Sequence, residues 1–119
     1  MPSFANPYSG NVNKKISKAE LIQALRIDIA SELEAIYLYD AHVLATDDPV
    51  AKKVLADIRN EGMEHVGELT ALMRYLDPSF AEFMLNGEGE VKEMMEELGV
   101  KEADITSISQ SVGSLIEDK

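Results

Sequence analysis

Apolar residues recur every three or four positions along two long stretches of the chain, residues 18–45 and 49–76. This is the spacing of one face of an α-helix. Each stripe has polar or small members in its middle: Glu32 in the first, and Gly62 with His65 in the second. The remaining members of the stripes are Leu21, Leu25, Ile29, Ile36, Tyr39 and Val43, and then Leu55, Ile58, Leu69, Leu72 and Leu76.

Local signals set the ends of these two helices. Residues 17–20 (SKAE) have the pattern of a capping box, in which a serine side chain and a glutamate side chain satisfy two backbone N–H groups. Asp48 followed by Pro49 predicts an N-cap and a first helical position. Asp77 before Pro78 predicts the end of the second helix at Leu76. The pattern therefore predicts an antiparallel two-helix hairpin.

The region after the hairpin has weaker signals. Ser79 is expected to cap a short helix over residues 80–85, and the glycines of residues 86–89 (NGEG) are expected to interrupt it. A further short helix over residues 90–98 should end at Gly99. The fold class is therefore all-α.

We expect three parts in the chain. Residues 1–16 are rich in Pro, Asn, Ser and Gly and predict an irregular arm. Residues 17–98 form the helical domain. Residues 99–119 are expected to be a flexible tail, because they are rich in serine and lack a long periodic pattern.

The unusual stripe members are predicted to lie in one layer. In a hairpin centred near Asp47, positions equally distant from the turn face each other, so Glu32 faces Gly62. His65 lies three residues further on, which is roughly 4.5 Å along the helix axis. A polar layer is therefore expected inside an otherwise apolar hairpin.

Two helices of this length cannot bury all of their apolar surface against each other. Two hairpins packed face to face would form a four-helix bundle. We therefore expect an obligate dimer or a larger assembly.

Composition narrows the function further. The net charge of −11 argues against nucleic acid or an anionic membrane as a partner and is compatible with cations. The chain has no cysteine, which excludes thiolate metal sites and thiol catalysis. No apolar run approaches the roughly 20 residues of a membrane span. A soluble cytoplasmic protein is the expectation.

The polar layer has the chemistry of a metal site. A buried carboxylate needs a partner or a cation, and carboxylate with imidazole suits iron, manganese or zinc. Di-iron helical bundles take a Glu from each of two helices and a Glu-x-x-His from each of the other two. Glu32 and His65 fit this recipe, but Gly62 stands where the bridging glutamate belongs. Glu61, four residues before His65, is the best substitute ligand.

The stretches 31–40 (SELEAIYLYD), 48–49 and 59–65 (RNEGMEH) resemble those of the encapsulated ferritins, the short ferritin-like proteins carried inside encapsulin shells. The resemblance covers about residues 17–98. It implies a dimer with a di-iron ferroxidase site at its interface, and the assembly of such dimers into a ring-shaped decamer.

The resemblance also assigns roles to residues. Glu32 and His65 match metal ligands, and Tyr39 matches a tyrosine beside the site; these three are expected to carry catalysis. Glu34 matches an acidic residue that draws metal towards the site. With Glu61, the expected metal-binding residues are Glu32, His65, Glu61 and Glu34.

Residues 111–116 (SVGSLI) in the tail are similar to a short encapsulin-targeting peptide. The chain is therefore expected to be an encapsulin cargo that oxidises Fe(II) with O2 for iron storage within the shell. The alternative is a ferritin-like cargo or adaptor that binds metal but is catalytically impaired, because Gly62 replaces the bridging glutamate.

Overall fold

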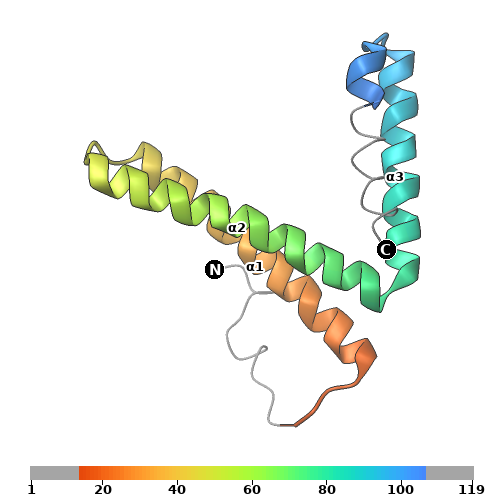
Figure 1. The fold of residues 1–119 in the computed structure, drawn as a ribbon, viewed down its shortest axis with the longest axis horizontal. Coiled ribbons are helices and arrows are strands. Elements are labelled where there is room, and N and C mark those ends of the chain that lie inside the picture. The colour runs from red at the N-terminus through yellow and green to blue at the C-terminus, as the bar shows by residue number, and fades with distance from the viewer. Residues whose placement is uncertain (1–13, 107–119) are drawn as a thin grey trace. The chain divides into compact units, whose positions relative to one another are not determined.

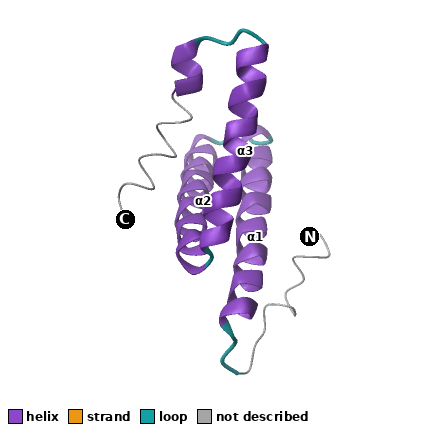
Figure 2. Ribbon diagram, turned by 90° about the vertical axis from the view of Figure 1, so that its right-hand side faces the viewer, coloured by secondary structure: helices purple, strands orange, loops and turns teal. Residues whose placement is uncertain are grey.

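A computed structural model describes residues 14–106 of the chain. Its helices are α1 (Lys18–Leu44), α2 (Pro49–Leu76) and α3 (Pro78–Glu97). Helices and loops account for the whole of the described part, which has no strand (Figure 2). The all-α prediction is confirmed. The chain divides into two compact units, one ending at Asp77 and the other beginning at Pro78.

The first unit is the predicted hairpin. Helices α1 and α2 lie antiparallel and side by side (Figures 1 and 2). At the start of α1, the Ser17 hydroxyl accepts a hydrogen bond from the Glu20 N–H at 3.1 Å, and the Glu20 carboxylate accepts one from the Ser17 N–H at 3.2 Å. The capping box is therefore formed, and it begins the helix at the predicted residue.

The turn between α1 and α2 is short and tied on both sides. Asp48 caps α2, its carboxylate accepting from the Ala51 N–H at 2.8 Å, and Pro49 occupies the first helical position. The Lys52 ammonium donates to the Val43 carbonyl at the end of α1, at 3.1 Å. These contacts hold the two helices in a single register.

The hairpin buries few side chains of its own. Leu25, Gly62 and Met73 are its buried residues. Large apolar side chains remain exposed on both helices, including Leu33 and Tyr37 on α1 and Leu72 on α2. Exposed apolar surface of this extent is typical of a surface that another molecule covers.

The second unit differs from the expectation of two short helices. Helix α3 runs without a break through residues 86–89 and begins at Pro78 instead of near Phe80. Gly87 and Gly89 have helical φ values, since Gly99 is the one described residue with a positive φ. A glycine costs a helix interior about 1 kcal/mol relative to alanine, which weakens α3 without ending it.

The predicted stop at Gly99 is confirmed. Gly99 has a φ of 75°, and its N–H donates to the Glu96 carbonyl while the Val100 N–H donates to the Met95 carbonyl. This pair of bonds is a Schellman motif. Residues 102–106, within the segment expected to be a flexible tail, are helical, and Ile105 is only 1% exposed. Most of the predicted irregular arm (residues 1–16) and the expected targeting peptide (residues 111–116) lie outside the residues that the structure describes.

None of the helices within residues 14–106 combines the length and the apolarity that a membrane span requires.

Candidate metal centre

Glu32 of α1 and His65 of α2 meet across the hairpin. The Nδ1 atom of His65 lies 3.3 Å from Oε1 of Glu32, and the two side chains are 51% and 30% exposed. The predicted polar layer is therefore present, with both groups at the surface of the single hairpin. Neither group is enclosed by one chain alone.

Gly62 lies opposite Glu32, as the register predicted. A Cβ atom at position 62 would come within 3.4 Å of Oε2 of Glu32 and within 3.1 Å of Cγ1 of Ile36. The second distance is tighter than ordinary van der Waals contact, so a side chain at position 62 would require Ile36 to shift by a few tenths of an ångström. The absence of a side chain at Gly62 thus permits the close approach of the two helices at this layer.

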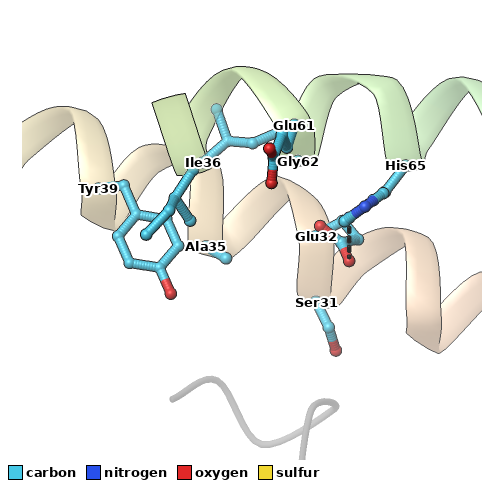
Figure 3. A pocket seen from close by; sticks show the side chains of 9 residues that line it. Ser31, Glu32, Ala35, Ile36, Tyr39, Glu61, Gly62 and His65 are labelled. Carbon is cyan, nitrogen blue, oxygen red and sulfur yellow. Dashed lines mark ion pairs between the residues drawn. The ribbon is translucent and has the colours of Figure 1, made fainter. Parts of the chain in front are cut away.

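An open pocket of about 270 Å³ surrounds the contact between Glu32 and His65 (Figure 3). Of the predicted site residues, Glu32, His65, Glu61 and Tyr39 line it, so the structure brings four of the five together. The full lining is Ser31, Glu32, Ala35, Ile36, Tyr39, Ile58, Glu61, Gly62 and His65.

Glu34, the fifth predicted residue, does not line this pocket. Its Oε2 atom is buried, and no hydrogen bond to that atom is found among the described residues. A carboxylate oxygen in this condition is costly without a compensating group. The expected role of Glu34 in attracting metal stays a prediction.

Sequence reasoning did not anticipate two contacts near the site. The Arg59 guanidinium pairs with the Asp40 carboxylate at 2.6 Å and so links α2 to α1. Counting from the turn places Val54, not Arg59, opposite Asp40. The long side chain of Arg59 spans the remaining distance along the helix and reaches Asp40. The second is the contact of Ile36 with Gly62, which depends on how closely the helices approach.

The donors present suit a divalent first-row metal ion. Two ligands bound to one ion at about 2.0–2.2 Å lie about 2.8–3.6 Å apart, depending on the angle between them, and the separation of Nδ1 of His65 and Oε1 of Glu32 is 3.3 Å. Within residues 14–106, no three His, Asp or Glu side chains are grouped closely enough to hold a metal. One chain in this conformation therefore presents a pair of ligands rather than a complete site.

An antiparallel helical hairpin with a carboxylate and an imidazole meeting between its helices is the arrangement from which ferritin-like bundles are built. The crystal structure of the encapsulated ferritin domain from Pyrococcus furiosus superposes with a TM-score of 0.69 at 38% sequence identity, covering 76% of this chain and 93% of that one. The chain belongs to the encapsulated ferritin family.

Two curated proteins are similar in sequence. A ferritin-like-encapsulin shell fusion protein of Pyrococcus furiosus is 39% identical over 89 residues, and the encapsulin nanocompartment cargo protein EncC of Myxococcus xanthus is 40% identical over 76 residues. These matches cover 75% and 64% of this chain, but only 26% and 58% of those proteins. No family model matches the chain.

Proposed function

We propose that the chain is an encapsulin cargo protein that binds Fe(II) between two subunits and oxidises it to Fe(III) with O2. The contact of Glu32 with His65 in an open pocket carries this proposal, because these two groups are suited to bind iron. The family adds support, since one relative is named as a cargo protein and the other as a fusion of a ferritin-like part with a shell.

A second copy of the chain is the proposed source of the remaining ligands. Five of the six large exposed apolar residues of α2, all but Met63, recur at helical spacing and surround the site; we call these five the α2 face. His65 lies near its centre, and Glu61 is one turn away from His65. The apolar residues of the α2 face are Val50, Val54, Ile58, Leu72 and Tyr75. A second hairpin packed on this face would bury them and bring two copies of the site together.

In this proposal iron is the substrate, and the protein binds it, orients it and excludes water. Glu32 supplies carboxylate oxygens and His65 an imidazole nitrogen, while Tyr39 lies beside them in the pocket wall. Each bound Fe(II) loses one electron, and O2 takes up the electrons together with protons. Assembly of dimers into a decameric ring, with mineral stored in the surrounding shell, completes the proposal.

A second function is favoured by one observation, the packing around Gly62. Since residue 62 is a glycine that packs close to Ile36, this chain lacks the bridging carboxylate of the di-iron recipe at that position. A site of this kind could hold metal without rapid oxidation. The protein would then be a metal-binding cargo or adaptor.

One assay separates the two functions. Anaerobic Fe(II) is mixed with the protein, air is admitted, and the ferric absorbance is followed in parallel with a Glu32→Ala variant. Ferroxidase activity predicts a faster rise for the unmodified chain than for Glu32→Ala. Equal rates would refute the oxidation, and a large gain in Gly62→Glu would identify the present site as impaired.

The cargo role is tested separately through the tail. The chain is co-expressed with an encapsulin shell protein, with and without residues 110–119, and the shells are purified and analysed for cargo. Deletion is expected to abolish packaging if the segment 111–116 is the targeting peptide. Unchanged packaging would contradict that role.

A further inference from the structure

The pocket contains a second carboxylate, that of Glu61, and among the described residues no ion pair joins it to His65, whose ion pair is with Glu32. Glu61 and His65 are four residues apart on α2, a spacing that places two side chains on one face of a helix. In Figure 3 the Glu61 side chain extends from α2 towards α1, beside Ile36 and on the same pocket as Glu32. The pocket therefore has two carboxylates and one imidazole on its walls.

Position 62 carries no carboxylate, and Ile36 packs closely beside it. A Cβ there would meet Ile36 at 3.1 Å, so any side chain at this position would require Ile36 to shift by a few tenths of an ångström. Glu61 is free of this obstacle, because it is an exposed side chain at the pocket wall.

Burial at an interface gives Glu61 a reason to bind a cation. It lies between Ile58 and Leu72 along the α2 face, so packing of a second hairpin on this face would remove Glu61 from water together with its apolar neighbours. A carboxylate removed from water without a partner is strongly unfavourable. Two copies of Glu61 and two of Glu32 at one interface would also repel each other, and a divalent cation relieves both costs.

We propose that Glu61 is the third ligand that each chain supplies, with Glu32 and His65, to a divalent first-row metal ion at the subunit interface. This inference rests on the interface site of the proposed function. In this arrangement the Glu and His ligands of α2 are four residues apart (Glu-x-x-x-His) instead of three (Glu-x-x-His). The Glu61 carboxylate then approaches the metal from the adjacent side of α2. Gly62 then serves close helix packing, and the ligand position has moved by one residue.

The test uses Co²⁺ as a probe, because its visible absorption reports both binding and ligand number without any turnover. The full chain is titrated anaerobically with Co²⁺, in parallel with Glu61→Gln and with Glu64→Gln. Glu64 is the matched control, since it is exposed, lies next to His65 and is not part of the pocket wall. Glu61→Gln is expected to lower the Co²⁺ affinity at least about tenfold and to change the spectrum, whereas Glu64→Gln stays within about twofold.

Two further variants make the result decisive. Glu61→Asp keeps the charge but shortens the side chain, and it should bind Co²⁺ more tightly than Glu61→Gln and less tightly than the unmodified chain. Equal affinity of Glu61→Gln and Glu64→Gln would overturn the assignment of Glu61. If Glu32→Gln lost Co²⁺ binding but Glu61→Gln did not, the assignment of Glu61 would be wrong and the interface site of the proposed function would stand. Unchanged Co²⁺ binding in Glu32→Gln would refute the interface site itself.

Discussion

His65 Nδ1 lies 3.3 Å from Glu32 Oε1, and this single contact joins the middle of α1 to the middle of α2. Both side chains are substantially exposed, at 51% and 30%, so water screens their attraction. A contact of this kind adds little to the stability of one hairpin. Its chemical value is the placement of an oxygen and a nitrogen at the separation of two ligands of one metal ion.

The first prediction follows from that screening. His65→Ala is expected to change the free energy of unfolding of the metal-free protein by less than about 1 kcal/mol, while abolishing most Co²⁺ binding. Urea denaturation in the presence of a chelator measures the first quantity, and a Co²⁺ titration the second. A destabilised metal-free protein with unchanged Co²⁺ binding would assign His65 a structural role instead.

The glycines of α2 provide the second prediction. Gly67→Ala is expected to raise the free energy of unfolding by about 0.5–1 kcal/mol, because alanine favours the helix and nothing lies within 4 Å of the added Cβ. Gly62→Ala should gain less or lose stability, since its Cβ would meet Ile36 at 3.1 Å. Urea denaturation of the two variants measures the difference. An equal gain at both positions would show that Ile36 moves aside freely.

Association is the subject of the third prediction. Val54→Lys places a charge on the α2 face and should shift the protein towards monomer, because that charge would be buried against a second hairpin. Met63→Lys is the control, an exposed apolar residue of the same helix that is not part of the α2 face. Light scattering after size exclusion, over a dilution series, measures the mass of each variant. Unchanged association of Val54→Lys would place the interface elsewhere.

The fourth prediction concerns the second unit. Gly99→Ala is expected to destabilise the end of α3 by about 1–2 kcal/mol, because a φ of 75° is unfavourable for residues with a Cβ. Gly87→Ala should have the opposite effect, since Gly87 is helical and nothing lies within 4 Å of its added Cβ. Hydrogen exchange of the α3 amides measures both, with faster exchange expected for Gly99→Ala and slower exchange for Gly87→Ala.

Much of the hairpin could be predicted because its ends are set by local chemistry. The Ser17–Glu20 capping box and the Asp48–Pro49 pair act over three or four residues, and both helices begin where these signals indicate. The turn then brings Glu32 opposite Gly62 by counting alone.

Other contacts between α1 and α2 could not be predicted, because they depend on the distance between the helices and on side-chain length, which residue numbers alone do not give. Ile36 approaches Gly62 because the helices pack closely there, and the Asp40–Arg59 pair depends on the length of one side chain. The interruption expected at residues 86–89 was wrong for a related reason. Glycine shifts a helix equilibrium by about 1 kcal/mol per residue, and such a shift weakens a helix of 20 residues without deciding whether it forms.

The short turn between α1 and α2 fixes which residues of the two helices face each other. One residue inserted between Glu32 and the turn would rotate the Glu32 side chain by about 100° away from His65, so single insertions or deletions there would separate the two ligands. A shift by seven residues, by contrast, nearly preserves the face of each helix. Leu25 precedes Glu32 by seven residues and Leu72 follows His65 by seven. The double variant Leu25→Glu and Leu72→His would therefore place a second carboxylate–imidazole pair about two helical turns further from the turn. Repeating this change would give one hairpin several metal sites along its length.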